Sequence, residues 1–166
     1  RSTLSQSSAA SDVYKRQKEF QAHQVHVCSA KEKDLLEKYV MNEAKTAVNP
    51  EVVGKPATEI AKNAGIKVPE GTKMLIAELE GTGKEYPLSL EKLSPVLAMV
   101  KSNNHEHGFE LAEKMLETGL GHTAAIHTED EDLQVGYAMR MKACRILVNT
   151  PTSQGGIGDI YNDMIP

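Results

Sequence analysis

The sequence predicts an α/β fold, in which a mostly parallel sheet is covered by helices. Compact apolar runs with turn residues on both sides recur along the chain, and segments with apolar residues at helical spacing lie between them. Strands that alternate with helices of this length are typical of βαβ crossovers, which join parallel strands. The chain has 166 residues, of which 40% are hydrophobic and 25% charged, so it is long enough to bury a sizeable core.

The first predicted elements are two helices. Ser29 is a candidate N-cap for the first helix. The apolar residues at helical spacing in that helix are Leu35, Leu36, Tyr39 and Val40. Pro50 and Gly54 indicate a turn, and a shorter helix follows over residues 58–63. Gly65 lies just past its last turn, where glycine commonly ends a helix.

Four strands are predicted next. Residues 74–79 (MLIAEL) form an apolar run between turn signals, which indicates a buried strand, and residues 81–87 form a loop. Further strands are predicted over residues 96–100, 123–127 and 145–150. The helix before 123–127 has an apolar face of Phe109, Leu111, Ala112, Met115 and Leu116, and the helix before 145–150 has one of Leu133, Tyr137, Ala138 and Met141. The acidic run 129–132 is expected at the N-terminus of the latter helix, where carboxylates complement the helix dipole.

Charge and cysteine content exclude several classes of function. The net charge of −4 gives no electrostatic reason to bind nucleic acid or anionic lipid, and no apolar run approaches the ~20 residues of a membrane span. The two cysteines form neither a disulfide framework nor a CxxC pair, so a reducing cytoplasm is expected. The histidine pairs, His23 with His26 and His105 with His107, lack further ligands at suitable spacing, and we expect no metal site.

Residues 1–17 differ from the rest of the chain. This stretch is Ser-rich, lacks hydrophobic periodicity and looks like a translated sequencing adapter. We therefore expect residues 1–17 to be a non-native, unpacked segment and residues 18–166 to be part of one catalytic domain. Both ends of the chain look cut, and the chain is expected to be a fragment of a longer protein.

Three segments combine polar residues with strand boundaries, where ligands bind in open α/β sheets. They are EKLSPV at residues 91–96, GLGHT at residues 119–123, and NTPTSQGGIGD at residues 149–159. Taken singly, Glu91 is typical of a solvated carboxylate, and His122 is typical of a structural histidine. The loop at residues 155–158 is not a GxGxxG phosphate loop, because Tyr161 stands in place of the third glycine.

Together, in this order and spacing, the three segments resemble the aldehyde dehydrogenase superfamily. EKLSPVLAMV, GLGHTAAIHT and RILVNTPTSQGGIGDIYN are most similar to the coenzyme-A-acylating branch, and within it to the aldehyde dehydrogenase half of bifunctional aldehyde-alcohol dehydrogenases. The upstream EVVGKPATEIAKNAGIKVPEGTKMLIAE fits the same proteins. The resemblance covers residues 18–165 and implies part of an aldehyde dehydrogenase catalytic domain.

The resemblance implies roles for single residues. Glu91 occupies the position whose carboxylate binds the ribose next to the nicotinamide of NAD. Leu93 stands where many relatives carry a phenylalanine near the nicotinamide, so that contact is altered. His122 matches the histidine of the GHT motif near the reacting thioester, where it handles protons for coenzyme A or steadies the intermediate. One departure is Thr118, where relatives usually have a glycine.

Residues 149–156 match the segment that closes on the substrate tunnel, which implies that Asn149, Thr150 and Ser153 line the substrate pocket. In this family a cysteine attacks the aldehyde, a hydride passes to NAD, and coenzyme A takes the acyl group. Neither cysteine of this chain lies in the Asn- and Gly-containing turn of that nucleophile. Cys144 opens a predicted strand and is interpreted as a small core residue.

The resemblance thus implies a parent enzyme that interconverts a short aldehyde, most simply acetaldehyde, and its acyl-coenzyme A, using NAD. The parent is expected to be a homo-oligomer, and this chain alone is expected to be inactive. Two alternatives remain: a monofunctional acylating enzyme for another short aldehyde, and a non-catalytic interaction domain on the same fold.

Overall fold

The computed structural model describes residues 19–20, 22–117 and 121–155. Predictions for residues 1–17, Thr118 and residues 156–166 therefore lie outside the described residues. The elements are β1 (Val25–Val27), α2 (Ala30–Val40), η1 (Pro50–Val52), α3 (Ala57–Asn63), β2 (Met74–Leu79), η2 (Pro87–Ser89), β3 (Val96–Val100), α4 (His105–Glu117), β4 (Thr123–Ile126), α5 (Glu131–Arg140), β5 (Arg145–Val148) and α6 (Thr152–Gly155).

The chain divides into two compact units. Unit 1 takes in residues up to 80 together with 86–100, and unit 2 takes in residues 81–85 together with those from 101 onwards. Unit 1 contains a parallel sheet in the order β1-β2-β3, and unit 2 contains the parallel pair β4-β5. The α/β class with parallel strands is confirmed, and the strands are divided between two sheets.

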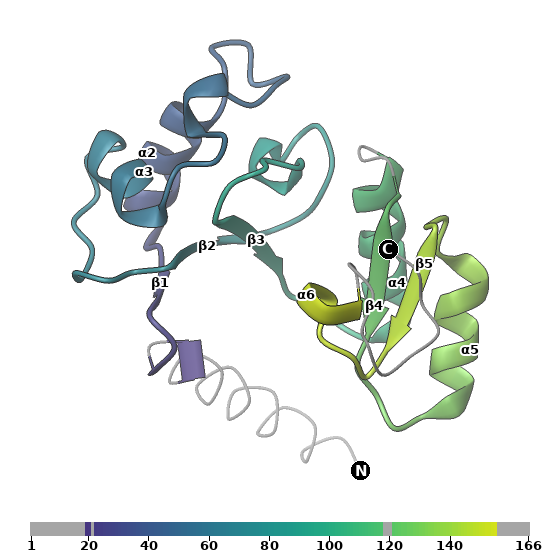
Figure 1. The fold of residues 1–166 in the computed structure, drawn as a ribbon. Helices are drawn as coiled ribbons and strands as arrows, with labels where there is room; N and C mark the ends of the chain where they lie inside the picture. The colour runs from purple at the N-terminus through teal and green to yellow at the C-terminus, as the bar shows by residue number, and fades with distance from the viewer. Residues whose placement is uncertain (1–18, 21, 118–120, 156–166) are drawn as a thin grey trace. The chain divides into compact units, whose positions relative to one another are not determined.

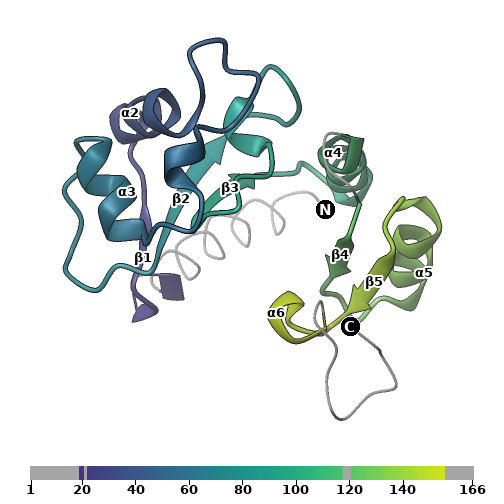
Figure 2. The same ribbon diagram turned by 45° about the horizontal axis from the view of Figure 1, so that its top comes forward.

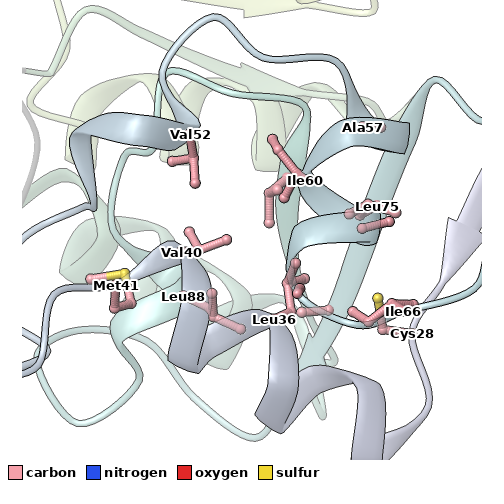
Figure 3. Packing of buried hydrophobic residues seen from close by; sticks show 14 of the residues in the cluster. Cys28, Leu36, Val40, Met41, Val52, Ala57, Ile60, Ile66, Leu75 and Leu88 are labelled. Carbon is pink, nitrogen blue, oxygen red and sulfur yellow. The ribbon is translucent and has the colours of Figure 1, made fainter.

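The core of unit 1 lies between the sheet and two helices. Figures 1 and 2 show α2 and α3 side by side against the sheet. The close view in Figure 3 shows apolar side chains from α2, η1, α3, β2 and η2 meeting in one cluster. Its largest fully buried members are Leu36, Val40, Val52, Ile60, Leu75, Leu88 and Val96. Each such burial contributes roughly 1.5–3 kcal/mol, so this cluster stabilises unit 1 more than any polar contact does.

Local sequence signals set the ends of the helices in unit 1. Ser29 is the N-cap of α2, and it forms a capping box with Glu32, as the main-chain N of Ser29 donates to Glu32 Oε2 (2.8 Å). Helix α3 ends at Asn63 with Ala64 as its C-cap, and Gly65 follows with a φ of +77°, a conformation that glycine adopts without a Cβ penalty. Both predicted helices are confirmed.

Unit 2 packs α4 and α5 around a smaller core. Phe109, Ala124, Tyr137 and Met141 are buried together, and the rings of Phe109 and Tyr137 meet edge to face at 5.3 Å. Arg140 joins the two helices: Nε and Nη2 donate to Glu113 Oε1 (3.3 Å) and Oε2 (2.6 Å), and Nη1 donates to Glu106 Oε2 (2.7 Å). The guanidinium also lies 5.4 Å from the Phe109 ring centre. The bidentate contact with Glu113 and the bond to Glu106 hold α4 and α5 in one register.

Two features differ from the expectations. Strand β1 was not predicted, because a run of only three residues (VHV) carries little periodicity of its own. The interpretation of Cys144 as a core residue is wrong, since its side chain is exposed immediately before β5. Its main-chain N donates to Gly121 O (2.7 Å), so the backbone joins the sheet pairing while the thiol faces outward. Among the described residues, no helix combines the length and apolar content that crossing a membrane requires.

Candidate functional site

The segment before β3 presents Glu91 and Leu93 outward. Both side chains are exposed, Leu93 by 68%, while Lys92 between them is buried with 7% exposure. Leu93 has a φ of +44°, a left-handed conformation that is unfavourable for a leucine. Among the described residues Glu91 makes no ion pair, so its two oxygens are open to a ligand.

Lys92 was missed by sequence reasoning. Its Nζ donates to the carbonyl oxygens of Leu88 and Leu90, the latter at 2.8 Å, at the end of the short turn η2. Burial lowers the pKa of the Lys92 ammonium from 10.5 to about 8, since a charge is costly away from water. No sequence signal marks this lysine, because lysines are ordinarily exposed.

His122 lies at the amino end of β4. Its ring is exposed, and Nδ1 lies 2.6 Å from Thr123 Oγ1, which leaves Nε2 for another partner. The preceding Gly121 is buried with a φ of +61°, and a Cβ at this position would clash with the carbonyl oxygen of Lys142. Gly121 O accepts from Cys144 N, and His122 O accepts from Arg145 N (3.1 Å). The backbone that carries His122 is therefore fixed against the start of β5.

The third segment follows β5. Asn149 is exposed with a φ of +53°, and both atoms of its amide bond the main chain of Thr128, at 2.9 Å each. Thr150 is half-buried and Oγ1 donates to Val148 O (3.1 Å), and Ser153 is exposed on α6. The amide of Asn149 is thus already engaged, which sequence reasoning did not anticipate. Its predicted place in the substrate pocket stays a prediction.

The predicted site residues do not form one cluster within a unit. Glu91 and Leu93 belong to unit 1, and the other four belong to unit 2. Within unit 2, β4 and β5 are parallel with Ile126 opposite Val148, so His122 lies at the amino end of the pair and Asn149 at its carboxyl end. Four strand residues lie between these two levels, so His122 and Asn149 are separated by five residue rises, or ~16 Å along the strands. Only the Asn149 segment lies at the carboxyl end, where open α/β sheets bind ligands.

The cysteines differ in environment. Cys28 is buried beside β1, and burial, with a smaller contribution from the charge of Glu32, raises the pKa of its thiol from 9.0 to about 11. A thiol with this pKa stays protonated at neutral pH and is a poor nucleophile. Cys144 is exposed. No group of three or more His, Cys, Asp or Glu side chains within the described residues is arranged to hold a metal ion.

A pocket of about 460 Å³ opens in unit 2 away from these residues. It is lined by Glu110, Glu113, Lys114, Leu116, Glu117, Arg140 and Lys142. The lining carries acidic and basic side chains in similar number, and Arg140 is already paired with Glu113. None of the predicted site residues lines it, so the pocket is not assigned to the site.

Comparison with known proteins identifies the relatives. No protein-family model matches the sequence. The chain is 46% identical over 156 residues to the aldehyde-alcohol dehydrogenase of Streptococcus pneumoniae, covering 89% of this chain and 18% of that protein. It is 41% identical over 147 residues to the bifunctional aldehyde-alcohol dehydrogenase of Escherichia coli, covering 86% of this chain and 16% of that protein.

The fold matches as well. An acetylating aldehyde dehydrogenase from Geobacillus thermoglucosidasius superposes with a TM-score of 0.82 at 40% identity, over 90% of this chain and 33% of that one. The chain therefore spans less than a fifth of the length of these two curated relatives. In sequence and in fold, the chain is homologous to one segment of these aldehyde-alcohol dehydrogenases and of this acetylating aldehyde dehydrogenase.

Proposed function

We propose that this chain is part of an NAD-dependent acylating aldehyde dehydrogenase, which interconverts a short aldehyde and its acyl-coenzyme A. The proposed substrate and product are acetaldehyde and acetyl-coenzyme A. The observation that carries the proposal is the similarity to proteins named aldehyde-alcohol dehydrogenase and acetylating aldehyde dehydrogenase, which extends over 86–90% of the chain. A cytoplasmic location, a homo-oligomeric parent and residues 1–17 as a non-native segment stay predictions.

Glu91 suits the ribose of a nicotinamide cofactor. A carboxylate accepts hydrogen bonds from two neighbouring sugar hydroxyls, and Glu91 is exposed with both oxygens open. When bound, NAD supplies the hydride acceptor of the reaction, and coenzyme A takes the acyl group. Glu91 orients the cofactor, and the exposed Leu93 beside it offers an apolar surface to the nicotinamide ring.

His122 suits proton transfer in the acyl-transfer step. The contact between Nδ1 and Thr123 Oγ1 orients the ring and leaves Nε2 to accept or donate a proton. The fixed backbone at Gly121 keeps this histidine at one place at the start of β4. We assign His122 the transfer of a proton to or from the thiol of coenzyme A.

The chain alone is proposed to be inactive as a dehydrogenase. Its buried thiol, Cys28, stays protonated at neutral pH, and Cys144 lies immediately before β5 rather than in a Gly-rich turn. Purified chain with acetaldehyde, NAD and coenzyme A should yield no NADH above a blank without protein. Turnover that disappears in Cys28→Ser or Cys144→Ser would refute this part of the proposal.

The role of Glu91 is tested in a chimera. Residues 22–155 replace the matching segment of the Streptococcus pneumoniae enzyme, which is 46% identical to this chain. Glu91→Gln removes the charge from the ribose contact and should lower kcat/KM for NAD by roughly ten- to a hundred-fold. Glu70→Gln, at another exposed carboxylate of unit 1, is the matched control and should leave the rate unchanged. Equal rates for both variants would rule out the assignment of Glu91.

A further inference from the structure

Three consecutive side chains before β3 alternate in direction. Glu91 and Leu93 are exposed, whereas Lys92 is turned into unit 1 with 7% of its surface exposed. The burial of Lys92 therefore fixes the side of the chain on which its two neighbours emerge. A lysine with this little exposure is uncommon, because its ammonium loses water on burial.

The contacts of Lys92 tie it to the preceding turn. Its Nζ donates to Leu88 O and Leu90 O, and Leu90 N in turn donates to Pro87 O (3.0 Å). Within the described residues, both partners of the ammonium are neutral main-chain carbonyls. An apolar side chain of the same length would fill this space without the cost of desolvating a charge. The ammonium fixes the position of the Lys92 side chain, because it can donate to both carbonyls only from one place.

The other end of the segment is also held. Leu93 O accepts a hydrogen bond from Gly54 N (3.2 Å), and Pro95 O accepts one from Leu75 N (2.9 Å), which sets the register of β3 against β2. The left-handed conformation of Leu93 persists because it is fixed from both sides. Between η2 and Leu93, the hydrogen bonds of the Lys92 side chain are the contacts nearest to Glu91 that hold this segment in place.

We propose that Lys92 is a positioning residue for the nicotinamide cofactor, because its hydrogen bonds to the carbonyls of Leu88 and Leu90 hold the Glu91 carboxylate toward the ribose. This inference rests on the proposed function of Glu91 and adds a residue that acts through it. Lys92 itself touches no reacting atom. Its removal should therefore act on cofactor binding and not on the affinity for coenzyme A.

The test uses Lys92→Met in the chimera that contains residues 22–155, with Lys67→Met at an exposed lysine of unit 1 as the matched control. Lys92→Met should raise KM for NAD by about ten-fold, because a displaced contact group loses much of its binding contribution. KM for coenzyme A should change by less than about two-fold, and Lys67→Met should change neither value. Lys92→Arg keeps donors for the carbonyls and should restore KM for NAD to within about three-fold of the parent.

A double-mutant cycle shows whether Lys92 acts through Glu91. If it does, Glu91→Gln with Lys92→Met should have the same KM for NAD as Glu91→Gln alone, whereas independent effects would multiply. No change with Glu91→Gln would overturn both assignments. A clear effect of Glu91→Gln with none of Lys92→Met would overturn only the inference about Lys92, as would equal losses toward NAD and coenzyme A. Lys92→Gln is the second variant, and failure of both variants to fold would assign Lys92 to core stability instead.

Discussion

Asn149 and Thr128 are joined by two hydrogen bonds that run in opposite directions. Thr128 N donates to Asn149 Oδ1, and Asn149 Nδ2 donates to Thr128 O, both at 2.9 Å. The main-chain N of Asn149 also donates to Ile126 O at 2.9 Å. The side-chain amide thus continues the pairing of β4 and β5 past their last residues and holds the two following loops together.

Loss of the Asn149 amide should destabilise unit 2. Asn149→Ala removes two hydrogen bonds and should lower the free energy of unfolding by about 1–3 kcal/mol. Asn149→Gly removes the same bonds but relieves the left-handed conformation at φ +53°, so it should be ~1 kcal/mol more stable than the alanine variant. Urea unfolding of the three proteins measures both differences. Equal stability of all three would contradict the structural role of this amide.

Gly121 should tolerate no side chain. Gly121→Ala places a Cβ against the carbonyl oxygen of Lys142 in a left-handed conformation, so the main chain on one side must move. We expect a loss of about 2–4 kcal/mol. The matched control is Gly136→Ala, in the middle of α5, where the nearest atom is Phe109 Cε2 at an ordinary 3.7 Å.

The control should gain about 0.5–1 kcal/mol, since alanine favours a helix over glycine. Thermal unfolding of both variants decides the matter. A Gly121→Ala protein as stable as the parent would show that the loop before His122 adapts freely, and the fixed position proposed for the histidine would then fail.

The sequence predicted those parts of the fold that depend on a few neighbouring residues. The N-cap at Ser29, the glycine at position 65 and the apolar run of β2 are each readable within a few residues. The hydrogen bonds of Asn149 join residues 21 positions apart, and no pattern in either segment indicates the other. The exposure of Cys144 likewise depends on which face of the β4–β5 pair its side chain points to, and the local sequence does not indicate that face.

The candidate site was predictable by resemblance and not by physical chemistry. Glu91 and His122 carry no periodicity or spacing that marks a ligand site, and the order of the three motifs singled them out. The burial of Lys92 was not predictable, because it depends on how the turn η2, to which its ammonium is bonded, packs against α2 and β3. Packing between elements decides burial wherever a residue type has two possible environments.

Stability of the chain should rise between pH 8 and 9. The pKa of Lys92 is about 8 in the folded state and 10.5 when the residue is unfolded, so the unfolded state binds more protons in between. The free energy of unfolding then increases by roughly 0.5–1 kcal/mol per pH unit, less than the ~1.4 kcal/mol of a full proton, because folded Lys92 is still partly protonated at pH 8. Above pH 9 the effect of Cys28 opposes this increasingly, because its pKa is about 11 when folded and 9.0 when unfolded. The two slopes cancel, and stability should level off.

Two variants separate the opposing contributions. Lys92→Met should abolish the rise between pH 8 and 9 and leave stability falling above pH 9. Cys28→Ala should let stability continue to rise beyond pH 9. Urea unfolding at pH 7, 8, 9 and 9.5 gives the slopes, and this range stays below the titration of Tyr137, whose pKa burial raises above 10.0. A parent protein with no slope between pH 8 and 9 would contradict the buried, charged state of Lys92 at neutral pH.

His122 should matter for acyl transfer and not for stability. Its ring is exposed, and its side-chain contact is to the neighbouring Thr123, so His122→Ala leaves no cavity and should keep the melting temperature of the chain within about 1 °C.

In the chimera, the same change should leave the first burst of NADH intact, because hydride transfer precedes the use of coenzyme A. Steady turnover with coenzyme A should fall by ~10²-fold, the usual contribution of a general acid or base. Thr123→Val removes the hydroxyl that orients the ring and should show the same pattern with a smaller loss. Equal losses in burst and turnover, together with a lower melting temperature, would make His122 a structural residue.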